Sequence, residues 1–215
     1  MRGRFKKWAE PLINENPKLA CFDNELNSDQ NFLKFLNKAK DNLILEIGSG
    51  KGKFITSMAS KFPSLYFLAI EKNVSISGIC LKEIIKSEVS NVFLISGDFE
   101  KIYPQIINTK FNTIFLNHPD PWPKKRHEKR RLTHPNFLLK YEQLLNGNNL
   151  ILKTDNLDMF NYSLETLKEN NWNITYLNYD YKQDDNFDAL TNYEEMFINK
   201  NIKINRLIAN KKGNK

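Results

Sequence analysis

The residues best able to perform chemistry lie between positions 117 and 131. This segment reads Asn-His-Pro-Asp-Pro-Trp-Pro-Lys-Lys-Arg-His-Glu-Lys-Arg-Arg. Asp120 stands between two prolines, which fix their own backbone and restrict the residue that precedes them. Six lysines and arginines then follow within the eight positions 124–131. A rigidly held carboxylate beside dense positive charge predicts chemistry on a polyanion, and a nucleic acid is the most plausible one.

A glycine-rich turn predicts a ligand site earlier in the chain. The apolar run 43–47 leads directly into Gly48, Gly50 and Gly52. Glycines after a strand let the backbone approach a nucleotide-like ligand closely. A dinucleotide fingerprint would need a glycine in place of Lys53, and a phosphate-binding P-loop would need one in place of Ile47. The turn therefore indicates another nucleotide-like ligand, unless it is only a tight connection between a strand and a helix.

Acidic residues stand at the predicted ends of three strands. Glu46 lies in the run 43–47, Glu71 follows the run 65–70, and Asp98 follows the run 92–96. Glu71 could accept hydrogen bonds from ribose hydroxyls, and Asp98 could accept one from an adenine amino group. Acids often end strands for solubility, but three of them around one glycine turn predict an acidic pocket that suits a cationic nucleoside.

The elements that would position these residues alternate along the chain. Short apolar runs predict strands at 43–47, 65–70, 92–96, 113–116 and 150–153. Helical patterns occupy 53–62, 76–89, 135–145 and 157–170. Such alternation predicts a parallel α/β sheet with right-handed crossovers. After Trp172, segments 172–181 and 196–204 indicate two strands with no helix between them, so an antiparallel hairpin should complete the sheet.

One domain accounts for residues 41–215, because no repeat or low-complexity linker divides them. Residues 1–40 form a separate basic N-terminal segment, with Arg2, Arg4, Lys6 and Lys7 near its start. We expect this segment to be partly flexible and a candidate for contact with RNA.

Composition narrows the partners of the protein. The 215 residues carry a formal net charge of +7, which favours an anionic partner. Cys21 and Cys80 match no metal or redox spacing, and the three histidines form no metal-binding pattern. No apolar run is long enough for a membrane span, and the N-terminus lacks a signal peptide core. We therefore expect a cytoplasmic protein with no membrane or metal partner, as either a monomer or a homodimer.

Two motifs resemble those of known methyltransferases. Glu46-Ile-Gly48-x-Gly50-x-Gly52 resembles motif I of class I S-adenosylmethionine-dependent methyltransferases. The stretch 120–132 is similar to the signature of bacterial tRNA (guanine-N7-)-methyltransferases, and segments 152–156 and 191–197 agree with it. The resemblance covers about residues 43–200. One departure is His118-Pro119, where the family more often has an aromatic or apolar residue followed by Ser or Pro.

This resemblance implies a fold, a reaction and a set of roles. The fold would be a Rossmann-like class I methyltransferase, with a mostly parallel seven-stranded sheet, an antiparallel C-terminal hairpin and helices on both faces. The reaction would transfer a methyl group from S-adenosyl-L-methionine to N7 of guanosine 46 in the variable loop of tRNA. Asp120 would be catalytic. Cofactor contacts would come from Glu46, Gly48, Gly50, Gly52, Glu71, Asp98 and Asp120. Substrate contacts would come from Lys124, Asp155, Thr191, Asn192, Tyr193 and Glu194. RNA contacts would come from Arg126, His127, Glu128, Lys129, Arg130 and Arg131.

Two other functions are compatible with part of the sequence. Asn117-His118-Pro119 faintly resembles the Asn-Pro-Pro-aromatic turn of methyltransferases that act on exocyclic amines, although the second proline and the aromatic residue are missing. The non-enzymatic alternative is a tRNA-binding protein that no longer uses the cofactor. The intact glycine turn and the four acids favour the enzyme.

Overall fold

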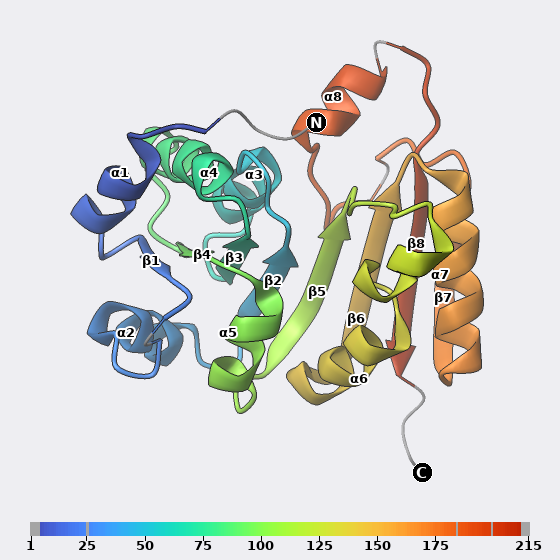
Figure 1. Cartoon of the computed structure of the whole chain (residues 1–215), viewed down its shortest axis with the longest axis horizontal. Coiled ribbons are helices and arrows are strands. Elements are labelled where there is room, and N and C mark those ends of the chain that lie inside the picture. Colours follow the sequence, from blue (N-terminus) through green and yellow to red (C-terminus); the bar gives the residue numbers. More distant parts are fainter. Residues whose placement is uncertain (1–4, 25, 184, 199, 212–215) are drawn as a thin grey trace.

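A single mixed sheet organises the protein in the computed structural model, which describes residues 5–24, 26–183, 185–198 and 200–211. Its strand order is β1-β4-β3-β2-β5-β6-β8-β7 (Figure 1). Only β8 runs against its neighbours, pairing antiparallel with both β6 and β7. This confirms the predicted mostly parallel sheet with an antiparallel C-terminal pair. The strands are β1 (Ala20–Phe22), β2 (Leu43–Ile47), β3 (Tyr66–Glu71), β4 (Val92–Ser96), β5 (Phe111–Asn117), β6 (Leu145–Thr154), β7 (Trp172–Asn178) and β8 (Asn205–Lys211).

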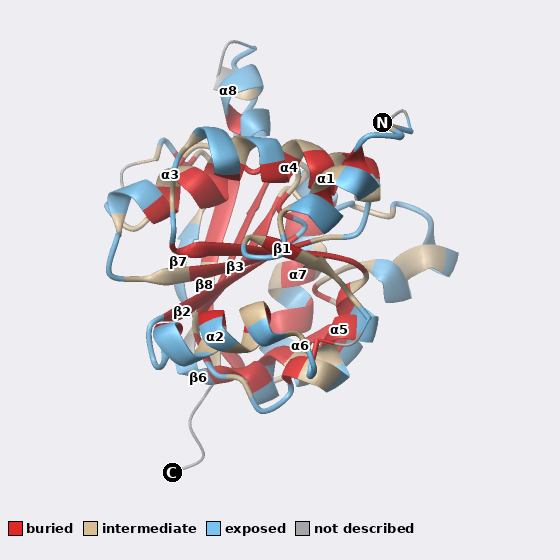
Figure 2. Ribbon diagram, turned by 90° about the vertical axis from the view of Figure 1, so that its left-hand side faces the viewer, coloured by how far each residue is buried: buried red, intermediate tan, exposed pale blue. Residues whose placement is uncertain are grey.

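Helices cover both faces of the sheet, as predicted. The helices are α1 (Ala9–Glu15), α2 (Gln30–Ala39), α3 (Lys53–Lys61), α4 (Val74–Lys86), α5 (Phe99–Ile106), α6 (Pro135–Leu144), α7 (Leu157–Glu169), α8 (Asn192–Ile198) and the 3-10 helix η1 (Lys125–Arg130). Successive strand residues point to opposite faces. Leu43 and Leu45 therefore pack with α2, α5, α6 and α7, whereas Ile44 packs with α1, α3 and α4. Buried residues run through the strands and along the inner faces of the helices (Figure 2).

The N-terminal segment adds an eighth strand to the seven that were predicted. β1 pairs in parallel with β4 at the edge of the sheet. Ile13 of α1 and Phe32 of α2 are both buried, on opposite faces. Of the basic residues near the start, Lys6 and Lys7 precede α1, while Arg2 and Arg4 lie outside the described residues.

The C-terminal region differs from the prediction of two strands with no intervening helix. β7 ends at Asn178, β8 begins only at Asn205, and α8 lies between them. The helix starts at a capping box: the Thr191 hydroxyl accepts the Glu194 N–H (3.0 Å), and the Glu194 carboxylate accepts the Thr191 N–H (2.8 Å). The segment predicted as a strand at 196–204 is therefore partly the end of α8. That prediction is wrong because the Thr191–Glu194 capping box starts a helix where a strand was expected.

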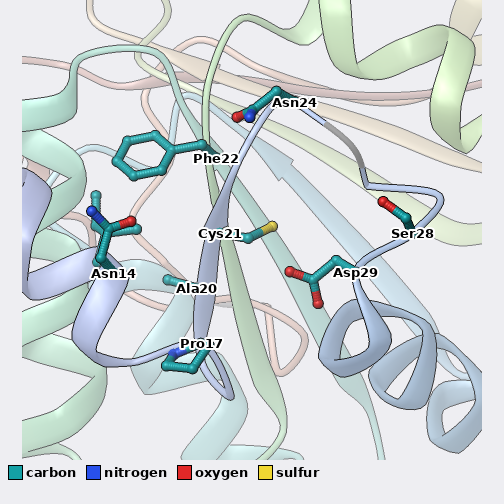
Figure 3. A pocket seen from close by; sticks show the side chains of 9 residues that line it. Asn14, Pro17, Ala20, Cys21, Phe22, Asn24, Ser28 and Asp29 are labelled. Carbon is teal, nitrogen blue, oxygen red and sulfur yellow. The ribbon is translucent and has the colours of Figure 1, made fainter.

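A cavity of about 310 Å³ lies beside the edge strand β1, between α1 and the start of α2 (Figure 3). Asn14, Cys21 and Asp29 are among its lining residues. Asp29 already accepts hydrogen bonds from the backbone of α2. Burial raises the pKa of the Cys21 thiol to about 12. None of the predicted site residues lines this cavity, so the candidate site lies elsewhere.

Candidate active site at the carboxyl edge of the sheet

The predicted acids meet at one edge of the sheet. β4, β3, β2 and β5 are parallel neighbours, so their carboxyl ends lie side by side. β2 carries Glu46 near its end, and β3 ends at Glu71. Asp98 follows β4, and β5 ends at Asn117. Ligands of open parallel sheets bind outside such carboxyl ends, which makes this edge the candidate site.

The glycine turn after β2 depends on its glycines. Gly48, Gly50 and Gly52 all have positive φ, at 83°, 56° and 88°. A Cβ atom on Gly52 would lie 2.9 Å from the Cys80 sulfur, so glycine also lets α3 pack closely on α4. The turn is fastened to β3, because the Gly50 N–H donates to Glu71 Oε2 (3.0 Å). The glycine turn and Glu71, the residue predicted to bind the ribose, are therefore held together.

Glu46 and Asn117 form a buried polar pair. Asn117 Nδ2 donates to Glu46 Oε1 at 2.7 Å. The other side-chain oxygen of each residue, Glu46 Oε2 and Asn117 Oδ1, is buried and has no hydrogen-bond partner among the described residues. Burial raises the pKa of Glu46 to about 7, although the Asn117 hydrogen bond opposes this shift. Two unsatisfied buried acceptors side by side suit a cationic hydrogen-bond donor.

Glu71 and Asp98 are held in position by their neighbours. Glu71 also accepts the Asn73 N–H at 2.8 Å. Burial raises its pKa, and the charge of Asp120 adds to the effect. Burial would also raise the pKa of Asp98, but the hydrogen bond from Lys72 (2.6 Å) lowers it overall. The Asp98 N–H donates to Asp23 Oδ2 (3.1 Å), so Asp23 belongs to this edge although the sequence did not single it out.

Asp120 lies in an unusual turn at the end of β5. His118 and Trp122 on either side of it have positive φ, at 48° and 42°. Asp120 is exposed, and its carboxylate accepts no hydrogen bond from the part of the chain that the structure describes. Its charge nevertheless acts on Glu71. Asp120 is therefore close to the acidic glycine-turn site and free to meet a ligand.

A second cluster surrounds the buried Lys153 at the end of β6. The Lys153 ammonium is fully buried and donates to Asp188 (2.9 Å), Glu194 (3.0 Å) and the Ala189 carbonyl (3.0 Å). His118 lies between this cluster and Asp155, with Nδ1 3.4 Å from Asp155 Oδ1 and Nε2 4.0 Å from Glu194 Oε2. The His118 interaction lowers the pKa of Asp155. The cluster thus joins α8 to β5 and β6.

The predicted substrate residues on α8 divide into two groups. Thr191 and Glu194 are buried and serve the capping box and Lys153. Asn192 and Tyr193 are exposed, and Tyr193 is 52% exposed. α8 lies above the carboxyl ends of the strands (Figure 1). Only the exposed pair can therefore reach a substrate directly.

Most of the basic run forms η1, which follows the Asp120 turn in the chain. Five of its cations are exposed: Lys124, Lys125, Arg126, Lys129 and Arg130. His127 lies edge-on against the Trp122 ring (5.8 Å), and the Arg130 guanidinium lies 4.9 Å from the centre of that ring. Glu128 and Arg131 are half-buried. Positive charge is thus concentrated next to Asp120.

Several residues at the carboxyl edge of the sheet were not predicted as site residues. Asn117 and His118 were noted only for their resemblance to the turn of exocyclic-amine methyltransferases and for the departure at His118, and neither was predicted as a site residue. Lys153 could have been predicted as a site residue, because a lysine in a run predicted as a buried strand requires a buried partner. That partner, Asp188, could not be identified from sequence spacing. Among the described residues, no group of three His, Cys, Asp or Glu could hold a metal ion. Within the same ranges, no helix has the length and apolar character needed to cross a membrane.

Known proteins resemble this chain in sequence and in fold. Residues 40–207 match the family model described as "Putative methyltransferase". The tRNA (guanine-N(7)-)-methyltransferase of Limosilactobacillus reuteri (strain DSM 20016) is 37% identical across 98% of this chain and 99% of its own length. The protein of the same name from Mycoplasmopsis synoviae (strain 53) is 43% identical across 93% of this chain and 98% of its own.

Solved structures add the fold. The 16S rRNA methyltransferase KamB has a TM-score of 0.66 and 14% identity, covering 86% of this chain and 94% of its own. A methyltransferase from Pyrococcus furiosus has a TM-score of 0.57 and 21% identity, covering 83% and 80%. The sheet is thus that of class I methyltransferases, and the chain belongs to the tRNA (guanine-N(7)-)-methyltransferase family.

Proposed function

We propose that the protein transfers a methyl group from S-adenosyl-L-methionine to N7 of guanosine 46 in the variable loop of tRNA. One observation carries this proposal most strongly. Asp120, whose carboxylate pairs with no described residue, acts electrostatically on Glu71 beside the glycine turn and is followed in the chain by the exposed cations of η1. A methyl donor and a nucleic acid would therefore meet at Asp120.

The residues of the edge fit the cofactor. S-adenosylmethionine supplies an electrophilic methyl group on a sulfonium centre. Glu71 would accept hydrogen bonds from the ribose hydroxyls, and Asp98 would accept one from the adenine amino group. The unsatisfied oxygens of Glu46 and Asn117 would accept from the ammonium of the amino acid portion. Gly48, Gly50 and Gly52 leave room for close approach of the backbone.

The guanine side of the reaction requires positioning more than proton transfer. Guanine N7 has a free lone pair and no proton to lose, so no strong general base is needed. Asp120 and Asp155 can accept from the guanine N1–H and N2–H groups, which adenine does not offer in this arrangement. Their charge would also offset the positive charge that develops on the methylated base. The exposed ring of Tyr193 could stack on the base.

The tRNA backbone would be held by the cations of η1. Phosphate contacts position a nucleic acid without reading its sequence. Lys124 would lie closest to the target base, because it is nearest to Asp120 in the chain, while Arg126 to Arg130 would follow the backbone. A tRNA substrate and this cofactor also favour a cytoplasmic location.

The exocyclic-amine alternative is less consistent with the site. In such enzymes an asparagine amide grips the planar amine. Here the Asn117 amide nitrogen donates to Glu46 at 2.7 Å inside the protein. A substrate amine donates its hydrogen bonds and would need the Asn117 Oδ1 acceptor, which is buried and which we assign to the ammonium of the cofactor.

The direct test is to incubate the protein with unmodified tRNA and cofactor labelled in the methyl group. We expect 7-methylguanosine in the nuclease digest, located in the variable loop by mass spectrometry of fragments. A matched tRNA with adenosine at position 46 should remain unlabelled. N2-methylguanosine in place of 7-methylguanosine would support the amine alternative. Cofactor binding without any methyl transfer would contradict the proposed function.

A further inference from the structure

Arg131 differs from the other cations of the basic run. The other five are exposed, whereas Arg131 is half-buried and lies just after η1. Its position next to Arg130 in the sequence predicts an equivalent phosphate contact. The structure places it differently, because its side chain turns back toward the residues that follow Asp120.

The Arg131 guanidinium contacts the backbone of the Pro-Trp turn. Its Nε donates to the carbonyl oxygens of Pro121 (3.1 Å) and Trp122 (3.3 Å), and its Nη2 donates to the Trp122 carbonyl (3.2 Å). The guanidinium also lies 4.2 Å from the centre of the Tyr162 ring on α7. Arg131 therefore links the turn to the body of the sheet domain.

The turn itself has few means of holding its shape. Pro119, Pro121 and Pro123 have no backbone N–H, so they cannot donate the hydrogen bonds that normally close a turn. Trp122 has a φ of 42°, a conformation that residues with a side chain rarely adopt. An external donor is therefore needed to keep the backbone after Asp120 in place, and Arg131 supplies it.

We propose that Arg131 is a positioning residue for methyl transfer, which holds the Asp120 turn against α7 instead of binding a tRNA phosphate. This inference rests on the proposed function, in which Asp120 faces the reacting base. The basic run then has two parts: Lys124 to Arg130 contact RNA, and Arg131 holds the turn in position.

Arginine is suited to this role in a way that lysine is not. Its planar fork can donate along one edge to two carbonyls while its face stacks on an aromatic ring. A lysine at this position keeps the charge but loses the fork and the stacking. Arg131→Lys therefore distinguishes a positioning role from a phosphate contact, since long-range attraction to RNA depends mainly on charge.

The first experiment compares Arg131→Lys with Arg130→Ala in the full chain. For each variant, the Kd for tRNA is measured over a range of salt concentrations, and kcat is measured at saturating tRNA and cofactor. For Arg131→Lys we expect a Kd and salt dependence within about twofold of wild type, since charge is conserved. Its kcat should fall by about 10- to 100-fold, since a small displacement of a positioned group has effects of that size. Arg130→Ala should instead weaken tRNA binding and lower the salt slope by about one.

The second experiment detects the turn without tRNA or cofactor. The chain has three tryptophans, so labelling with 5-fluorotryptophan gives three fluorine NMR signals that Trp→Phe variants can assign. Arg131→Lys should shift or broaden the Trp122 signal and leave those of Trp8 and Trp172 in place. This result would hold even if wild-type protein failed to methylate tRNA, so the two proposals can fail separately.

Three outcomes would overturn the proposal that Arg131 is a positioning residue. One is an unchanged Trp122 signal in Arg131→Lys, and another is a wild-type kcat in that variant when wild-type protein is active. The third is a loss of tRNA affinity in Arg131→Lys as large as that in Arg130→Ala. Because Arg131→Lys removes no charge and creates no large cavity, it remains informative even if Arg131→Ala does not fold.

Discussion

Glu46 is a buried carboxyl in the candidate site, and no cationic group of the described residues lies within hydrogen-bonding distance of it. Burial raises its pKa from the ordinary value of 4.5 to about 7. The folded protein therefore binds this proton more tightly than the unfolded chain does. Its contribution to stability is present below about pH 4.5 and is lost as the pH rises through about 7.

Glu46→Gln tests this linkage. We expect the substitution to stabilise the protein at pH 8 relative to wild type by up to about 3 kcal/mol, since each pKa unit corresponds to about 1.4 kcal/mol. The difference between variant and wild type should be smaller at pH 5. Urea unfolding of both proteins at the two pH values measures it. An identical difference at pH 5 and pH 8 would show that Glu46 does not titrate in this window.

Asp120 allows a sharper test of catalysis. Asp120→Asn keeps the size of the side chain but removes the charge that we propose offsets the charge developing on guanine. We expect kcat to fall by about 100-fold, in the range found for single electrostatic groups in active sites. Single-turnover assays with saturating tRNA measure this loss. Asp158→Asn, an exposed acid in the first turn of α7, is the matched control and should stay within about twofold of wild type. Full turnover with unchanged cofactor affinity in Asp120→Asn would remove Asp120 from the catalytic role.

At the residue scale, the sequence revealed the acids more readily than their partners. Glu46, Glu71 and Asp98 were predictable because each lies in or directly follows an apolar run. The Glu46–Asn117 pair depends on how β2 aligns with β5, and no local pattern specifies that alignment. The role of Arg131 depends on its side chain turning back to the Pro121 carbonyl, which no local pattern specifies, so the sequence predicted only its charge.

Among the elements, α8 depends most on a single buried charge. Lys153 of β6 binds Asp188 and Glu194, and the His118 side chain, 4% exposed, packs beside Tyr193 and Phe197. Removing one member of a buried ionic cluster leaves the others uncompensated. The Lys153 ammonium is therefore the buried cation that, together with the His118 contacts, holds α8 over the site.

Lys153→Met should destabilise the protein by about 3–5 kcal/mol, because Asp188 and Glu194 would remain buried without their cation. Backbone amides of α8 should lose hydrogen-exchange protection more than those of α3. Lys168→Met, at an exposed position of α7, serves as the control and should change stability by less than about 0.5 kcal/mol. Equal loss of protection in α3 and α8 would mean that Lys153 does not specifically hold α8.

The strands of the central sheet and helices α3, α4, α6 and α7 were predictable, because short apolar runs alternate with helical periodicity along this part of the chain. Helix α5, between β4 and β5, was not predicted. α8 was not predicted, since it has only seven residues and a capping box marks its start. β1 was missed for a related reason. It has only three residues, and its pairing with β4 joins parts of the chain that are far apart.

At the scale of the whole molecule, the candidate site lies at the carboxyl ends of four parallel strands, with α8 above them (Figure 1). A ligand bound there would contact β2, β3, β4 and β5 together. Because these strands also form the core, binding should stabilise the entire fold and not one loop alone.

S-adenosylhomocysteine, the product form of the cofactor, tests this expectation. At a concentration of about 100 times its Kd, a ligand adds about 2.7 kcal/mol to stability. For a domain of this size we expect Tm to rise by about 5–10 °C. Differential scanning calorimetry measures the shift, and Glu71→Ala should reduce it. An unchanged Tm at millimolar ligand would argue against a cofactor site at this edge.

The position of β8 has a consequence for how the chain is made. β8 lies between β6 and β7 in the sheet, although it follows both in the sequence. While a ribosome is still adding residues 205–211, β7 has no neighbouring strand to pair with, and one edge of β6 is open. Unpaired edges of this kind invite pairing between different chains. The nascent protein should therefore be most prone to aggregation just before its last strand is synthesised, and a chaperone that covers strand edges would help most at that stage.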